Sequence, residues 1–135
     1  MNDPASHTND GLVDTLATEI ASLLARLLEH GEGGSIDLRS LPLSPACIAA
    51  LEQCLGQGEI TARLDAAGKS DIRETGFPAV WWTRHYDETG HLIAALIEVA
   101  YVPGILKADI DDIRYGARRL AARTNLAQHW RRIAE

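Results

Sequence analysis

The two turn sequences between Gly56 and Pro103 constrain the fold of this chain more than any other feature. Residues Asp65–Gly68 and Asp87–Gly90 both place Asp at the first position of a type I turn and Gly at the fourth, where the backbone φ angle becomes positive. A loop of this kind, with its glycine bulge, joins two antiparallel strands. We therefore predict two hairpins of the same design in the middle of the chain.

The register of the first hairpin follows from its turn. Counting outward from that turn pairs Asp65 with Lys69, Leu64 with Ser70, Arg63 with Asp71, Ala62 with Ile72 and Thr61 with Arg73. Opposite charges then meet twice on one face of the hairpin, and apolar side chains gather on the other face. This separation is typical of an antiparallel sheet with one buried face.

The second hairpin separates polar from apolar residues less clearly. Counting outward from its turn pairs Asp87 with His91, Tyr86 with Leu92, His85 with Ile93, Trp82 with Leu96 and Trp81 with Ile97. Residues 92–102 are apolar on both faces apart from Glu98. This pattern indicates either a central strand covered on both sides or a surface that binds a partner.

Helical patterns precede the hairpins. Residues 11–30 carry Leu and Ile at helical spacing until Gly31, which is a typical helix C-cap. Apolar and polar residues alternate at the start of residues 36–43, which predicts a short extended segment. Ser44, followed by a proline, then begins a second helix that ends at Gly56.

A third helix is expected after the hairpins. Its apolar stripe, spaced to pack on the sheet, is Leu106, Ile110, Ile113, Ala117 and Leu120. Gly116 lies inside this helix, at a cost that a close helix contact could offset, and Asn125 predicts a short last helix through Ile133. The expected class is α+β: an antiparallel β-meander of about four strands with three to four helices packed on it.

Composition restricts the domain organisation and the compartment. The chain has 135 residues and a net charge of −6, which argues against general binding to nucleic acid or to anionic membranes. Residues 1–10 lack the basic and apolar regions of a signal peptide, and no run approaches the ~18 apolar residues of a membrane span. We expect a disordered tail over residues 1–10, one domain over residues 11–135 and a cytoplasmic location.

The charge is unevenly distributed. Residues 107–135 hold seven Lys or Arg against four acidic residues, whereas the rest of the chain holds six against fifteen. Asp residues stand early and Arg residues late in the third helix, as the helix dipole favours. The alternative reading is that the basic residues form a docking surface.

Trp81 and Trp82 are the main candidates for binding a partner. Adjacent residues of a strand point to opposite faces, so one indole lies outside the main core unless both faces are covered. Two interpretations follow: both indoles are covered, or one is an exposed anchor for a protein partner. Phe77 and Pro78, with Glu74, lead into this strand and could form the rim of such a site.

A second cluster has the residue types of a metal site or an acid–base site. His85, Asp87 and His91 fall near one hairpin end in the predicted register, and two imidazoles with a carboxylate can bind zinc. A hairpin tip is polar for ordinary reasons, however, and the sequence shows neither a fourth ligand nor a nucleophile beside them. We expect no bound cofactor and no catalytic residues.

The two cysteines stand seven residues apart on the second predicted helix. Two helical turns separate Cys47 from Cys54 by more than the roughly 7 Å that a disulfide allows between Cα atoms. We interpret both as small buried hydrophobic residues.

Several segments together resemble one known family, the carboxy-terminal domain of the HupH/HyaF hydrogenase expression/formation proteins. The resemblance extends over roughly residues 15–123. The segments that carry it, in order along the chain, are Gly31–Glu32, Ile36–Leu43, Leu55–Glu59, Glu74–Thr75, Pro78 with Val80–Trp82, and Ile97–Pro103.

The resemblance implies a cytoplasmic accessory protein for maturation of nickel–iron hydrogenase, without enzymatic activity. Its implied partner is the iron–sulfur small subunit or the precursor of that subunit, with other hydrogenase accessory proteins as further partners. Family members are typically longer and carry the module twice, whereas this chain has one copy. The contact surface expected here is the Trp-bearing sheet, the Ile36–Leu43 segment with Arg39, or both.

Two other functions stay open at this point. One is a metal-dependent enzyme that uses His85, Asp87 and His91. The other is a structural domain that associates with itself through a free sheet edge.

Overall fold

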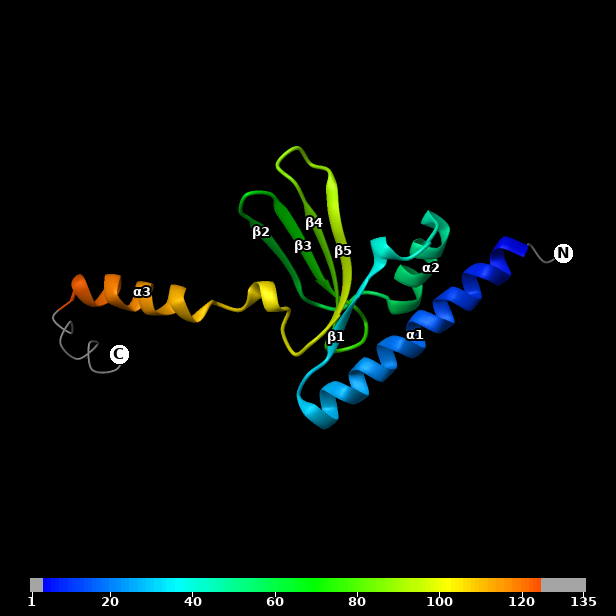
Figure 1. The fold of residues 1–135 in the computed structure, drawn as a ribbon, viewed down its shortest axis with the longest axis horizontal. Coiled ribbons are helices and arrows are strands. Elements are labelled where there is room, and N and C mark those ends of the chain that lie inside the picture. Colours follow the sequence, from blue (N-terminus) through cyan, green and yellow to red (C-terminus); the bar gives the residue numbers. More distant parts are fainter. Residues whose placement is uncertain (1–3, 125–135) are drawn as a thin grey trace. The chain divides into compact units, whose positions relative to one another are not determined.

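The computed structural model describes residues 4–124, with side-chain surroundings from residue 11 onward (Figure 1). By contacts the chain forms two compact units, Met1–Pro103 and Gly104–Glu135. The first unit contains α1 (Pro4–His30), β1 (Gly34–Asp37), the 3₁₀ turn Leu38–Ser40, α2 (Pro45–Leu55), β2 (Thr61–Asp65), β3 (Lys69–Glu74), β4 (Val80–Tyr86) and β5 (Leu92–Val99). The second contains the 3₁₀ turn Gly104–Leu106 and α3 (Ile110–Ala122).

The sheet is antiparallel and has five strands in the order β1-β5-β4-β3-β2. The α+β class is therefore confirmed, with one strand more than expected. The extra strand is β1, which pairs with β5 so that Ile36 lies opposite Ile97. Only its second half, Ile36 and Asp37, was expected to be extended, and nothing in its sequence indicates which strand it joins.

The core lies between α1, α2 and one face of the sheet, as Figure 1 shows. Helix α1 contributes Leu16, Ile20 and Leu27, and these side chains are buried with Trp82 and Ile97. The caps of α2 are those predicted: the Ser44 hydroxyl accepts the amide of Cys47, and Gly56 ends the helix at φ 68°. The expected burial of the cysteines is half right, because Cys47 is buried and Cys54 is exposed.

The predicted register of the first hairpin is confirmed at every pair, from Thr61 opposite Arg73 to Asp65 opposite Lys69. The predicted register of the second hairpin is right only near the turn, where Tyr86 lies opposite Leu92.

A β-bulge between His85 and Tyr86 shifts the rest of the second hairpin by one residue. His85 lies opposite Ala94 instead of Ile93. Beyond it the pairs are Trp82 with Ile97 and Trp81 with Glu98, instead of the predicted Leu96 and Ile97. The extra residue of the bulge is Ile93. A bulge of this kind reverses which face each β5 side chain occupies relative to the prediction.

The two hairpin turns also differ from each other. Asp87–Gly90 is the predicted turn: Gly90 has φ 88° and donates its amide to the Asp87 carbonyl. In Asp65–Gly68, Gly68 has no positive φ, and the Ala66 amide donates to the Gly68 carbonyl instead. Glycine is required there because an added Cβ would stand 2.1 Å from the carbonyl oxygen of Tyr86.

Helix α1 extends further toward the amino terminus than the helical pattern from residue 11 predicted. Helix α1 begins at Pro4, so residues 4–10 are helical where a disordered tail was expected. Proline suits the first turn of a helix because its missing amide has no intrahelical partner to lose there. The short last helix predicted from Asn125 lies outside the described residues. No helix in the range 4–124 is both long enough and apolar enough to cross a membrane.

Helix α3 spans most of its predicted range and has Asp109 as its N-cap. Its apolar stripe was expected to be packed. Instead Ile110, Ile113 and Leu120 are each more than half exposed. The described residues place α3 in a compact unit separate from the sheet.

Candidate functional site

Both tryptophans of the pair are buried, each with 5% of its surface exposed. Trp82 lies opposite Ile97 and belongs to the core beneath the helices. Trp81 points to the other face, as strand alternation requires, and its indole N–H donates to the carbonyl oxygen of Ala100 at 3.0 Å. This hydrogen bond ties the chain that leaves β5 to the beginning of β4.

The loop between β3 and β4 is held by hydrogen bonds to three neighbouring segments. The Gly76 amide donates to the carbonyl of Leu55 at the end of α2, and the Ala79 carbonyl accepts the amide of Ala100. The buried Thr75 hydroxyl lies 2.9 Å from the Val80 carbonyl oxygen, to which it donates. The loop therefore has one defined conformation without a helix or strand of its own.

The backbone of this loop has an unusual conformation at Ala79, whose φ is 73°. A non-glycine residue rarely adopts a positive φ, and the conformation is kept only where its surroundings impose it. Ala79 packs against the core, while Phe77 is 50% exposed and Pro78 is exposed. The strained residue thus turns inward, and two apolar side chains of the same loop face solvent.

A second exposed apolar segment meets this loop at the hydrogen bond between Ala79 and Ala100. Tyr101 is 64% exposed, and Val102 is exposed beside it. Figure 1 shows the β3–β4 loop and the chain leaving β5 at the same end of the sheet. We call the side chains of Phe77, Pro78, Tyr101 and Val102 the Phe77 surface.

Two members of the Phe77 surface were not among the site residues predicted from sequence. Tyr101 and Val102 follow the predicted last strand and precede a proline, and two apolar residues past a strand end are a signal that could have identified them. An exposed apolar group that includes large aromatic rings is typical of a surface that binds another protein.

The structure brings some of the predicted partner-binding residues together and separates others. Glu74 ends β3 where the β3–β4 loop begins, and its carboxylate accepts a hydrogen bond from the amide of Glu59 at 3.3 Å. Arg39 lies at the opposite end of β5, where its guanidinium donates to the carbonyl of Leu92 at 2.9 Å. Arg39 therefore belongs to a different part of the surface from Phe77 and Pro78.

Arg84 extends across the core face of the sheet. Its guanidinium lies 4.7 Å from the ring centroid of Trp82 and forms an ion pair with Glu52 of α2. A small cavity of about 60 Å³ lies beside these side chains and is also lined by Glu74 and Thr75. The ion pair joins α2 to the middle of β4.

The residues proposed as metal ligands are only partly together. Nδ1 of His91 lies 3.8 Å from the Asp87 carboxylate, whereas His85 shares a 2.7 Å hydrogen bond with Ser70. The hydroxyl of Thr89 and the amide of His91 hold the pKa of the Asp87 carboxyl below its usual range. Asp87 thus stabilises its own turn, and within residues 11–124 no group of His, Cys, Asp or Glu side chains is placed to hold a metal ion.

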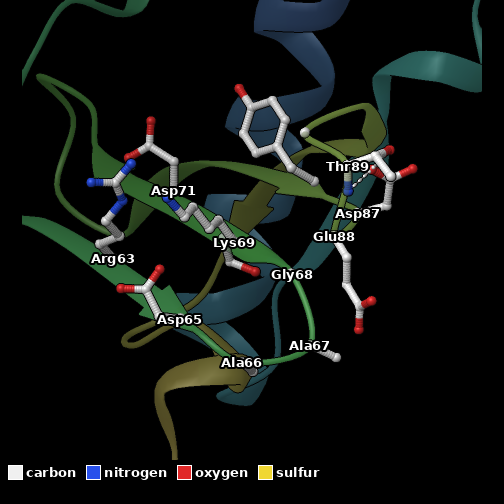
Figure 2. Close-up of a pocket in the computed structure, with 13 residues that line it drawn as sticks. Arg63, Asp65, Ala66, Ala67, Gly68, Lys69, Asp71, Asp87, Glu88 and Thr89 are labelled. Atoms are coloured by element: carbon white, nitrogen blue, oxygen red, sulfur yellow. Dashed lines mark hydrogen bonds between the residues drawn. The ribbon is translucent and has the colours of Figure 1, made fainter.

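A pocket of about 970 Å³ lies between the two hairpin turns, and Figure 2 shows it. Its charged lining carries both signs, with more carboxylates than basic groups: Arg63, Asp65, Lys69, Asp71, Asp87 and Glu88. Of the site residues predicted from sequence, it contains only Asp87. The pocket and the Phe77 surface lie at opposite ends of the sheet, because one adjoins the β4–β5 turn and the other the β3–β4 loop.

Comparison with known proteins identifies relatives of this chain. The family model described as HupH hydrogenase expression protein, C-terminal conserved region, matches residues 13–127. Among solved structures, the hydrogenase expression protein HupH from Thiobacillus denitrificans is 40% identical, with a TM-score of 0.79. The match covers 84% of this chain and 94% of that one.

Curated relatives carry names of the same kind. Hydrogenase expression/formation protein HupH of Rhodobacter capsulatus is 30% identical over 118 residues, which are 83% of this chain and 41% of the relative. Hydrogenase-1 operon protein HyaF of Escherichia coli is 31% identical over 117 residues, which are 83% of this chain and 39% of the relative. The chain thus spans about two-fifths of the length of these proteins.

Proposed function

Because the chain belongs to the HupH hydrogenase expression protein family, we propose that it is an accessory protein of hydrogenase maturation that binds a hydrogenase subunit before assembly. The observation that carries this proposal is the family match over residues 13–127, together with relatives named for hydrogenase expression and formation. The chain acts as a binding protein in the cytoplasm, without a cofactor and without catalysing a reaction.

The partner is the iron–sulfur small subunit of a nickel–iron hydrogenase or its precursor, as the family resemblance implies. The contact is made by the Phe77 surface. Its exposed apolar side chains stand on backbone that is held by hydrogen bonds, so binding loses little conformational entropy. Large aromatic side chains such as Phe77 and Tyr101 provide much of the contact area that drives association.

The tryptophan pair supports this surface from beneath. Trp81 holds the Ala100 carbonyl and so positions Tyr101, and Trp82 fills the core under the β3–β4 loop. Both residues therefore affect partner binding through the shape of the Phe77 surface, while Phe77 itself touches the partner. Glu74 stands at the edge of this contact, and Arg39 lies outside it.

Capture of purified hydrogenase subunits by the tagged chain tests the proposal. The wild-type chain should retain the small-subunit precursor and not the large subunit. Phe77→Asp and Tyr101→Asp should reduce capture strongly, because each places a charge at the centre of an apolar contact.

The matched control is Ile93→Asp. Ile93 is 56% exposed, so the substitution introduces the same charge at a similarly exposed apolar residue, but at the other end of β5. Capture by Ile93→Asp should equal that of the wild type. Equal capture by correctly folded Phe77→Asp and Tyr101→Asp would show that another surface binds the subunit, and no capture by the wild type would refute the proposed partner.

A further inference from the structure

Helix α3 presents an apolar stripe to solvent. Ile110, Ile113 and Leu120 recur at helical spacing on one side of the helix and are each more than half exposed, with the half-buried Ala117 between them. An isolated helix of 13 residues is marginal in water, and most helices of this length are stabilised by packing of their apolar face. We therefore expect a partner surface to cover the stripe of α3.

The charges along α3 distinguish between possible partners. Asp109 and Asp112 stand at the beginning of the helix, and Arg123 stands at its end on the same flank of the stripe. Among residues 11–124, neither Asp112 nor Arg123 is part of an ion pair. A second α3 in antiparallel orientation would place the acidic beginning of each helix beside the basic end of the other. A parallel arrangement would place like charges together.

Three other charged groups of α3 already have contacts within the helix. Arg114 lies 3.5 Å from the Asp111 carboxylate, and Arg119 lies over the Tyr115 ring at 5.5 Å from its centroid. Tyr115 projects from the side of the helix away from the stripe. Among residues 11–124, the charged side chains of α3 and its C-cap that have no ion pair or ring contact are Asp112 near the beginning, and Arg118 and Arg123 toward the end.

Gly116 gives a second, independent indication that another helix packs on α3. It lies on the edge of the stripe in the middle of α3, where glycine weakens a helix relative to alanine. A Cβ atom added at Gly116 would meet nothing within 4 Å, so no contact within the described part of the chain explains the glycine. Close approach of a second helix at this level would explain it.

We propose that α3 pairs antiparallel with α3 of a second copy of this chain, about a two-fold axis at the level of Gly116. Asp109 and Arg123 each lie seven residues from Gly116, so the axis brings Asp109 of one copy level with Arg123 of the other. The stripes interdigitate between these charged ends. This helix face belongs to a different compact unit from the Phe77 surface, and the inference does not depend on the proposed function.

Sedimentation of the full chain over a wide concentration range tests the pairing. A helix contact about 20 Å long is a small interface, so the range should extend to roughly 1 mM. The wild-type mass should rise from 14.7 kDa toward twice that value. Ile113→Glu should weaken the association at least about tenfold, because pairing would bury an unpaired carboxylate.

Tyr115→Glu is the matched control. Tyr115 is exposed like Ile113 and lies on the same helix, but on the side away from the stripe, so this variant should associate as the wild type does. Circular dichroism of both variants checks that the helical content is retained.

Charge reversal tests the orientation. Asp112→Arg alone and Arg123→Glu alone each place like charges together in an antiparallel pair, so each should associate more weakly than the wild type. A mixture of the two variants should regain association, because both contacts between positions 112 and 123 then join opposite charges.

A wild-type chain that stays monomeric at all concentrations would overturn the proposal. So would a dimer that persists in Ile113→Glu, or a mixture of the two charge variants that associates no better than each variant alone.

Discussion

Identical substitutions at the two adjacent tryptophans should have different effects on stability. Trp81 and Trp82 are equally buried, and replacing either by Phe removes the same atoms. The packing cost of the smaller ring is therefore similar at the two positions and cancels in the comparison. What differs is the indole N–H. That of Trp81 donates to Ala100, whereas that of Trp82 is buried without a partner among the described residues.

The size of the difference follows from these two groups. Trp81→Phe loses a hydrogen bond worth about 1 kcal/mol and leaves the Ala100 carbonyl without that donor. Trp82→Phe removes a buried, unpartnered N–H, whose desolvation costs about 1–3 kcal/mol. It also weakens the contact between Arg84 and the ring, which is worth about 0.5–1 kcal/mol. We expect Trp81→Phe to be the less stable variant by about 2 kcal/mol.

Urea unfolding followed by circular dichroism measures this difference, with equal m-values as the check that both variants unfold as the wild type does. Equal stability of the two variants, or a lower stability of Trp82→Phe, would refute the reasoning from the indole hydrogen bonds.

Three further predictions concern single positions. Gly68→Ala should destabilise the chain by roughly 1–3 kcal/mol in urea unfolding, because its Cβ would stand 2.1 Å from the Tyr86 carbonyl oxygen. Cys54 should react with a thiol reagent in the native protein, whereas the buried Cys47 should react only on unfolding, and equally fast reaction of both would contradict the structure. The lowered pKa of Asp87 means that its stabilising effect is present above its unfolded-state pKa and is lost as the pH falls through the lower folded-state pKa. When the pH is lowered, Asp87→Ala should therefore lose less unfolding free energy than the wild type does, as acid unfolding curves measure. The same pH dependence in both proteins would argue against this role of Asp87.

The accuracy of the sequence-based register depended on how well each strand alternates. In β2 and β3, polar and apolar residues alternate, so a shift of one residue would have exposed Ile72 and buried charged groups. Strand β5 is apolar on both faces, and the extra residue Ile93 changes its register without any visible penalty in the sequence. Bulges of this kind are invisible wherever the pattern does not distinguish the two faces.

The role of glycine in the two hairpin turns shows a second limit. At Gly90 the local sequence was sufficient, because the positive φ arises within the turn itself. At Gly68 the requirement comes from the backbone of Tyr86 in the neighbouring hairpin, which a local sequence pattern cannot contain.

Only part of the Phe77 surface could be predicted from the sequence. Alternation along β4 predicted that Trp81 and Trp82 face opposite sides, but their burial depends on chain segments distant in sequence, such as Ala100. The exposed residues beside them, Phe77 and Tyr101, are brought together by one backbone hydrogen bond between separate loops.

The most direct test of the proposed function is capture of the hydrogenase small-subunit precursor by the wild-type chain, Phe77→Asp and Ile93→Asp under identical conditions. Binding through the Phe77 surface predicts that the wild type and Ile93→Asp retain the subunit, while folded Phe77→Asp does not. Retention by all three chains, or by none of them, would contradict it.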